Sequence, residues 1–399
     1  MSAAPTLYGQ RIALFFGGYF IFAGVLLPFF PVWLQSRSLN ESEIALCLSL
    51  PLALRVFLTP FAASFADRAP NRRFAIRLFV GVALLAFLCA WPASGFWLLL
   101  LTTGTAVVFW HFSLPVAEAL ALTGVRRFGL DYGRMRFFGS VTFILTNLAG
   151  GAVLGAFAAG NIYWLLLAGL LVCFATAFIL PVTPPAIRAL DDGKRKARRP
   201  FREIVARPAI LTLFLASGLV QAGHAMVYGF GSLYWQGLGF SGVEIGAFWA
   251  TGVICEICLF IWSGAVVRRF GDLGLLGIGI GGALLRWCLF PFVGDAWSVV
   301  LVQSLHGLSF GASYLGLQHF IARVVPDDMT ASAQGIYAMI SGIIMAGMTA
   351  ACGPLYATFG AEAFALMAVP AALAAILLVA TQRLSRAERL QPQTSGEGG

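Results

Sequence analysis

The sequence predicts an all-α membrane protein with twelve transmembrane helices in two pseudo-symmetric six-helix bundles. Of its 399 residues, 59% are hydrophobic and only 11% are charged, whereas an average soluble domain has about 25% charged residues. The mean hydropathy is +0.86. Twelve apolar runs occur along the chain, and each approaches or exceeds the roughly 20 helical residues that cross a hydrocarbon core. Composition and run length therefore both exclude a soluble globular fold.

Polar segments separate the apolar runs and define the expected spans. The first run follows Arg11; it is too long for the apolar part of a signal peptide and lacks a small-residue cleavage site, so we interpret it as a span. The predicted spans are 11–34, 42–66, 72–93, 96–123, 134–159, 161–183, 207–236, 242–268, 272–293, 296–323, 330–358 and 360–382. They form an N-terminal bundle (1–183) and a C-terminal bundle (207–383), with a basic linker (184–206) and a disordered tail (384–399).

The basic residues predict the orientation of the chain. Of 26 Lys and Arg, only Arg37, Arg55 and Arg286 lie outside the N-terminus, the even-numbered loops with their helix ends, and the C-terminus. The positive-inside rule therefore puts both termini in the cytoplasm. The net charge of +9 then reflects topology near anionic lipid, and we expect no nucleic-acid partner.

The two halves repeat each other weakly. Ala63 precedes Asp67-Arg68 in the second loop, and Gly264 precedes Arg268-Arg269 in the eighth, with 201 residues between corresponding positions. Small residues at such positions let helices approach closely. Two parallel six-span halves with a site between them at mid-membrane are typical of transporters.

Three ionisable residues lie in consecutive apolar runs of the second half, namely Glu256, Arg286 and His306. A charged side chain facing lipid at the bilayer centre costs roughly 2.5–3.5 kcal/mol, so we expect the three to converge on internal water. Burial favours a neutral carboxyl group, and a nearby guanidinium favours the ionised form. We therefore expect Glu256 to pair with Arg286, and to take up a proton when an anionic substrate takes the arginine. A static ion pair that fixes helix packing is the alternative.

Several stretches resemble a known family. The repeated six-span halves, the basic linker and the loop motif that begins at Ala63 resemble the major facilitator superfamily. Within it, four features are similar to the phenylpropionate-permease group and its relative, lactose permease. They are Pro28–Leu34, Leu130–Ser140, Gln221–Phe230 and the spacing from Arg286 to His306. The similarity covers essentially the whole chain, and it implies a secondary transporter that works by alternating access.

The resemblance implies roles for residues of the second half. Arg286 and His306 fall on the arginine and histidine of lactose permease's proton-coupling cluster. Ser309 stands where that permease has a glutamate, and Glu256 lies about one turn from its glutamate on span 8. Because Glu256 is the one deep carboxylate left in this half, we assign the proton to it.

In the first half, Arg136 matches the arginine that holds substrate in lactose permease; anchoring the cytoplasmic end of span 5 is the alternative role. The glutamate partner of that arginine is replaced by Leu122, which argues against a galactoside substrate. Glu118, one turn earlier, can pair with Arg136 instead, and it shares a helix face with His111. Arg55 has no evident partner, and a cavity role and a structural role both stay open.

Span 7 has one polar face, formed by Gln221, His224 and Tyr228. We expect this face to line the cavity, and helix–helix hydrogen bonding is the alternative. The tryptophans that can offer a surface to an aromatic ring are Trp110, Trp235 and Trp249.

These features lead us to expect proton-coupled uptake of a small organic anion, for which the resemblance suggests a phenylpropanoid acid. Nucleoside or sugar symport is the second interpretation and drug/proton export the third. We expect no enzyme, because H-E-x-x-H and G-x-S-x-G motifs do not occur. The expected location is the inner (plasma) membrane, as a monomer, with substrate, protons and lipid as partners and with no metal or cofactor.

Overall fold

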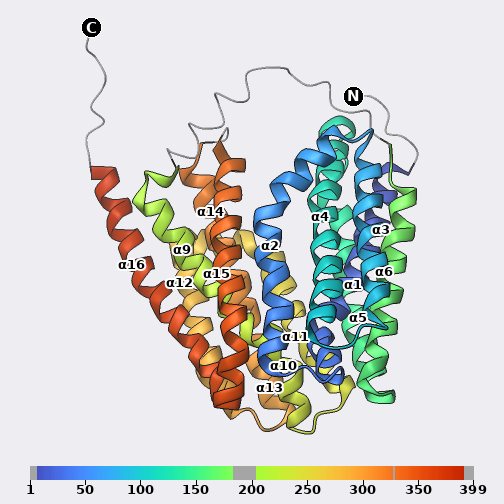
Figure 1. Ribbon diagram of the computed structural model, residues 1–399. Helices are drawn as coiled ribbons and strands as arrows, with labels where there is room; N and C mark the ends of the chain where they lie inside the picture. The colour runs from blue at the N-terminus through green and yellow to red at the C-terminus, as the bar shows by residue number, and fades with distance from the viewer. Residues whose placement is uncertain (1–6, 183–203, 327–328, 391–399) are drawn as a thin grey trace.

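The computed structural model describes residues 7–182, 204–326 and 329–390, which are helical and contain no strand (Figure 1). The N-terminal half consists of α1 (Tyr8–Ser36), α2 (Glu41–Arg68), α3 (Arg72–Ala90), α4 (Phe96–Phe128), α5 (Tyr132–Ala156), η1 (Ala159–Asn161) and α6 (Ile162–Ile179). The C-terminal half consists of α9 (Pro208–Ala222), α10 (Ala225–Gly237), α11 (Gly242–Ile261), α12 (Ser263–Leu289), η2 (Phe290–Phe292), α13 (Ala296–Ser304), η3 (Gly307–Ala312), α14 (Ser313–Val324), α15 (Thr330–Phe359), η5 (Gly360–Met367) and α16 (Ala368–Leu390).

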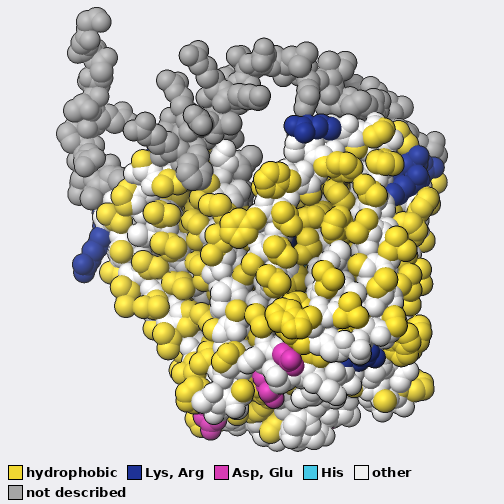
Figure 2. Space-filling view, in the orientation of Figure 1, with side chains coloured by type: hydrophobic (Ala, Val, Ile, Leu, Met, Phe, Trp, Pro, Cys, Tyr) yellow, Lys and Arg dark blue, Asp and Glu magenta, His cyan; other side chains and the backbone are white. Residues whose placement is uncertain are grey.

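The halves form two helical bundles that stand side by side (Figure 1). The start of α1 and the end of α16 lie at the same end of the molecule, as an even number of crossings requires. Figure 2 shows a side wall that is mostly hydrophobic, with most of its basic side chains toward that end and its acidic side chains at the other. Basic side chains thus gather toward the end at which α1 begins and α16 ends.

Ten helical stretches of the described chain are long and apolar enough to cross a membrane. One of them, Ser332–Arg386, has 55 residues, and a straight helix of that length would measure about 80 Å, more than twice the hydrocarbon thickness. It is divided at Gly360, whose φ of 56° ends α15. A further crossing, α13–η3–α14, is interrupted and falls outside the ten. With this division the described segments are compatible with the predicted twelve crossings, and the all-helical prediction is confirmed.

Helix caps repeat between the halves. Asn40 caps α2 in a reciprocal capping box with Glu43, and Ser241 caps α11 in the same way with Glu244. Each box satisfies two backbone N–H groups that the first turn of a helix leaves free. The two boxes are 201 residues apart, which is the offset of the loop motifs, so the repeat extends to corresponding helix starts.

The bundles touch at backbone level at the end away from the described chain ends. A Cβ atom at Gly151 of α5 would lie 2.3 Å from the carbonyl oxygen of Gly242 in α11. On the other side of the interface, a Cβ atom at Gly353 of α15 would lie 2.5 Å from the carbonyl oxygen of Glu41 in α2. Glycine is therefore needed at both crossings, and it permits the close approach.

Three boundaries differ from the predicted ones. Span 7 is broken between α9 and α10 at Gly223–His224. The helical stretch after Trp262 continues through the predicted loop and turns at Gly271, where φ is 68°. The last helix continues to Leu390 rather than ending near residue 383, while the predicted linker 184–206, apart from 204–206, and the end of the predicted tail lie outside the described residues.

Candidate functional site

A cavity of about 270 Å³ lies between the two bundles. Its walls come from α1, α5, α10, α11, α12, α13 and η3, so both halves contribute to it. The residues that line it are Phe20, Leu27, Arg136, Ser140, Phe143, Val227, Tyr228, Trp249, Gly252, Val253, Glu256, Arg286, Gln303, His306 and Phe310. We call this the first cavity; it combines aromatic walls with a few charged groups, as ligand pockets commonly do.

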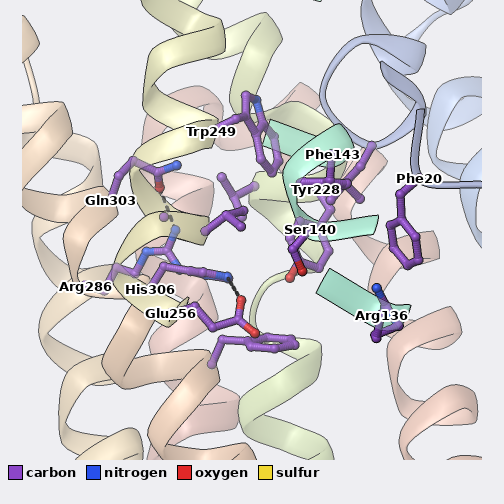
Figure 3. Close-up of a pocket in the computed structure, with 15 residues that line it drawn as sticks. Phe20, Arg136, Ser140, Phe143, Tyr228, Trp249, Glu256, Arg286, Gln303 and His306 are labelled. Carbon is purple, nitrogen blue, oxygen red and sulfur yellow. Dashed lines mark hydrogen bonds and ion pairs between the residues drawn. The ribbon is translucent and has the colours of Figure 1, made fainter. Parts of the chain in front are cut away.

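The three ionisable residues of the second half come together at one wall of the first cavity (Figure 3). His306 lies between the other two. Its Nδ1 atom is 3.0 Å from Nη1 of Arg286, and its Nε2 atom is 3.7 Å from Oε2 of Glu256. The convergence expected from the cost of buried charge is therefore present, with the imidazole as the link.

The expected direct ion pair between Glu256 and Arg286 does not form within 4 Å among the described side chains. Arg286 is instead held against span 10: it donates to Oε1 of Gln303 and, over 3.3 Å, to Oγ of Ser309. Only 1% of Arg286 is exposed. These two acceptors and His306 hold the guanidinium on the far side of the imidazole from the carboxylate, which explains why the direct pair does not form.

Donor chemistry fixes the tautomer of His306. A guanidinium has only N–H donors, so the Nδ1 atom that faces Arg286 must accept the hydrogen bond. The proton of the neutral ring then resides on Nε2, which points toward Glu256. Arg286 thus donates to Nδ1 of His306, and the N–H group at Nε2 of the same ring points toward the carboxylate of Glu256. A second proton could join Nδ1 only if the contact with Arg286 broke.

Helix irregularity and glycine bring spans 8 and 10 together here. A π-helical segment, η3, begins directly after His306, and such segments are frequent at functional sites. A Cβ atom at Gly307 would lie 2.9 Å from the carbonyl oxygen of Cys255 in α11, and one at Gly252 would lie 3.3 Å from Cβ of His306. The two glycines therefore let α11 approach closely enough for Glu256 to reach the imidazole.

The polar face of span 7 divides between the two roles that the sequence left open. Gln221 donates to Oγ of Ser313 over 3.2 Å, and Nε2 of His224 lies 3.1 Å from Oγ of Ser309. Both side chains are buried and join span 7 to span 10. Tyr228 alone of the three lines the cavity. Because the helix breaks at Gly223–His224, a continuous polar stripe toward the cavity does not form.

Arg136 faces the cluster from the N-terminal bundle, beside Phe20 (Figure 3). Its guanidinium carbon lies 4.0 Å from the ring centroid of Phe20 and 5.6 Å from that of Phe16, which are cation–π distances. The expected ion pair with Glu118 is not formed within 4 Å among the described residues. Glu118 lines neither central cavity, and it interacts with Arg136 only through longer-range electrostatics.

A second cavity of about 330 Å³ adjoins the first. The predicted residues Arg55, Trp110 and His111 line it, together with Tyr228. The other residues that line it are Ala23, Leu26, Leu27, Phe30, Cys47, Leu48, Leu52, Val107, Phe143, Gly229, Met345 and Thr349. The two cavities share Leu27, Phe143 and Tyr228. We call the one with the larger volume the second cavity.

Sequence reasoning missed some of the side chains that define the first cavity. Gln303 lies one helical turn before His306 on the same face, so the spacing could have identified it. Phe20, Ser140 and Phe143 carried no such signal, because apolar and small residues fill most of every span. Of the tryptophans expected to offer a ring surface, Trp249 and Trp110 line the two cavities, while Trp235 is fully buried in the core.

The chain is similar to known membrane transporters. The family described as "MFS_1 like family" matches residues 10–366. The "Probable 3-phenylpropionic acid transporter" of Escherichia coli (strain K12) is 30% identical over 367 residues, covering 90% of this chain and 95% of the relative. The "Maltose permease" of Geobacillus stearothermophilus is 25% identical, covering 82% of each chain.

Solved structures support the fold. A structure of the nucleoside transporter NupG matches with a TM-score of 0.79 at 15% identity, covering 95% of this chain and 99% of that one. A bacterial homolog of the human lysosomal transporter Spinster, inward-facing and unoccupied, matches with a TM-score of 0.70 at 18% identity, covering 96% and 98%. At these identities the likeness shows the arrangement of helices alone.

Proposed function

The chain belongs to the MFS_1-like family and is a secondary transporter rather than an enzyme, and from this premise we propose that it imports a small organic anion together with a proton. One observation carries the proposal: Glu256 is the only acidic side chain that lines either central cavity in the described chain. It lies in the membrane-spanning part beside a neutral imidazole and faces a cationic side chain of the opposite bundle. Intramembrane carboxylates in such places serve as proton carriers.

We propose an aromatic monocarboxylate of the 3-phenylpropionate type as substrate. The walls of the first cavity support this class, since Phe20, Phe143, Tyr228, Trp249 and Phe310 offer ring surfaces around the charged groups. Aromatic rings pack favourably on one another in offset or edge-to-face geometry. The relative from Escherichia coli carries the name of such an acid, which is consistent with this choice.

Arg136 is the proposed ligand of the substrate carboxylate. The sequence alone favoured Arg286 for competition between substrate and proton, but that residue is almost fully buried with three polar partners. Arg136 has no carboxylate within 4 Å among the described residues, and it lines the first cavity. Displacing a cation–π contact costs less than breaking three hydrogen bonds to a buried guanidinium.

Competition for the field of Arg136 links substrate to proton. Arg136 interacts electrostatically with Glu256 across the cavity. A substrate carboxylate bound to Arg136 neutralises the positive charge of the guanidinium. In a low-dielectric cavity the substrate's own negative charge also disfavours the ionised form of Glu256. Glu256 then binds a proton, so that substrate and proton bind together.

The charge balance favours one proton for each anion. Moving a single negative charge into a compartment that is 100 mV negative costs about 2.3 kcal/mol. A monoanion with one proton is neutral, so the loaded and empty carriers have the same charge as they reorient. Transport then follows the substrate and pH gradients and is insensitive to the membrane potential.

Uptake by purified protein in liposomes tests the proposal. A panel of labelled aromatic acids, sugars and nucleosides would be tested in two conditions, with either the liposome interior or the external medium more alkaline. The external pH would be recorded in both. We expect aromatic acids to be accumulated when the interior is alkaline. The rise in external pH should correspond to the removal of one proton for each molecule taken up. Uptake of sugars or nucleosides alone would instead support the second candidate, for which the similarity to a maltose permease is the argument.

We propose the remaining features on the same basis. The protein works as a monomer in the inner membrane, with both termini in the cytoplasm. Residues 1–183 and 207–383 act as the two units that rock about the central site, as inverted and parallel repeats do in other transporters. The backbone contacts at Gly151 and Gly353 close the cavity on the side away from the termini.

A further inference from the structure

The second cavity is lined by a cationic side chain, Arg55, that the proposed mechanism does not use. The guanidinium of Arg55 lines it and has no hydrogen bond or ion pair with any side chain or backbone group that the structure describes. The surrounding walls from α1, α2, α4 and α15 are mainly apolar. An unpaired charge in such surroundings within a membrane is costly, and it is retained mostly where it serves a ligand.

Two neighbouring ring side chains, Trp110 and His111, line this cavity beside Arg55. Nε1 of Trp110 is a buried donor without a hydrogen-bond partner among the described atoms, although the indole ring is fixed by stacking on Tyr19 at 4.1 Å between centroids. His111 has its Nδ1 atom 2.8 Å from the carbonyl oxygen of Val107. The neutral ring must therefore donate from Nδ1, which leaves Nε2 as an acceptor.

The second cavity adjoins the first along a shared wall. Leu27, Phe143 and Tyr228 line both cavities, so a movement of these side chains would join the two spaces, and one elongated molecule could then lie across both with its middle against two rings. The combination of an apolar body, one guanidinium and a nearby imidazole acceptor is suited to a molecule whose far end carries oxygen. A guanidinium binds carboxylate and hydroxyl oxygens, and His111 Nε2 can accept from a hydroxyl group.

We propose that the second cavity is a subsite for the far end of the substrate, and that this end carries an oxygen group bound by Arg55. The substrate class is then an aromatic acid with a polar oxygen substituent opposite its propionate chain, rather than an unsubstituted ring. This inference rests on the proposed function, because the propionate end is taken to bind Arg136. Phenolic hydroxyl and ring carboxylate share the required chemistry.

Binding of a substrate series tests the subsite. Purified full-length protein would be titrated with 3-phenylpropionate and with its para-hydroxy and para-carboxy analogues, by competition against labelled 3-phenylpropionate. Hydrogen bonds to charged groups change affinity by about tenfold or more. We expect at least one para-oxygen analogue to bind about tenfold more tightly than 3-phenylpropionate, and the analogue that gains identifies the source of the oxygen.

Variants of Arg55 test whether its guanidinium causes the gain in affinity of the para-oxygen analogue. Arg55→Gln should remove the advantage of the para-oxygen analogue and leave the affinity for 3-phenylpropionate within about twofold of wild type. Arg55→Lys should keep part of the advantage for the carboxylate, because it retains charge. The matched control is Arg134→Gln, at an arginine side chain that is 90% exposed. If Arg55→Gln does not fold, the wild-type series still decides the question.

The outcomes separate this inference from the proposed function. Equal affinity for all three acids in the wild type would overturn the subsite, as would an advantage that survives in Arg55→Gln. Either result leaves proton-linked transport of 3-phenylpropionate untouched. Absence of any binding or proton-linked uptake of aromatic acids would overturn the proposed function itself.

Discussion

Replacing Glu256 with Gln tests the proposed proton carrier, because no other acidic side chain lines either central cavity in the described chain. His306 cannot substitute for it, since Nδ1 of that ring accepts from Arg286. Gln has nearly the shape of a protonated Glu and, like it, carries no charge. We expect Glu256→Gln to bind substrate and to exchange it across the membrane, but to lose accumulation driven by a pH gradient.

The size of the effect follows from charge. With one proton per anion, a gradient of one pH unit supports about tenfold accumulation. Without the proton, an interior at about −100 mV opposes the anion by about 2.3 kcal/mol, which at equilibrium excludes it about 50-fold. Between wild type and Glu256→Gln the steady-state ratio of internal to external substrate should therefore differ by about 500-fold under both gradients.

The assay is uptake and exchange of labelled substrate in liposomes with imposed pH and potassium-diffusion gradients. The matched control is Glu362→Gln, at an exposed carboxylate of η5, which should accumulate substrate as wild type does. Tenfold accumulation per pH unit in Glu256→Gln would refute the assignment of the proton. Loss of both exchange and accumulation would place the residue in substrate binding instead.

Three further predictions concern other parts of the site. Arg136→Gln should weaken binding of a carboxylate substrate about 10- to 100-fold and spare its uncharged carboxamide analogue; equal losses would contradict the assignment. His306→Gln, which can accept from the arginine and donate to the glutamate, should keep the pH profile of uptake, whereas His306→Phe should shift it, and identical profiles would reduce the imidazole to packing. The side chain introduced by Gly151→Val should clash with the carbonyl group of Gly242. This variant should therefore stop transport and lengthen the distance between spin labels on α5 and α11. Gly160→Val, at a position with open space around it, should change neither transport nor this distance.

Much of the fold follows from sequence because lipid leaves few choices. Backbone groups in a bilayer must be satisfied within the segment, so long apolar runs become helices. Basic loops then predict the direction, and the start of α1 and the end of α16 lie at the same end of the molecule. The break at Gly223 and the π-helical turn after His306 were not predictable, because hydropathy carries no information about them; both lie where side chains of spans 7 and 10 hydrogen-bond to each other.

The membership of the charged cluster was predictable, but its connectivity was not. The cost of buried charge required Glu256, Arg286 and His306 to converge, and the structure brings them together. Which two of them touch depends on competing partners. Gln303 and Ser309 hold Arg286 away from the carboxylate, and their effect could be found only in three dimensions.

Proton uptake on substrate binding tests the central claim most directly. Lightly buffered, purified protein would be mixed with saturating 3-phenylpropionate while pH is recorded with an indicator dye, at a pH where Glu256 is ionised in the empty protein. The account predicts uptake of about one proton per bound molecule in the wild type and none in Glu256→Gln. Binding without proton uptake in the wild type, or equal proton uptake in the two proteins, would contradict it.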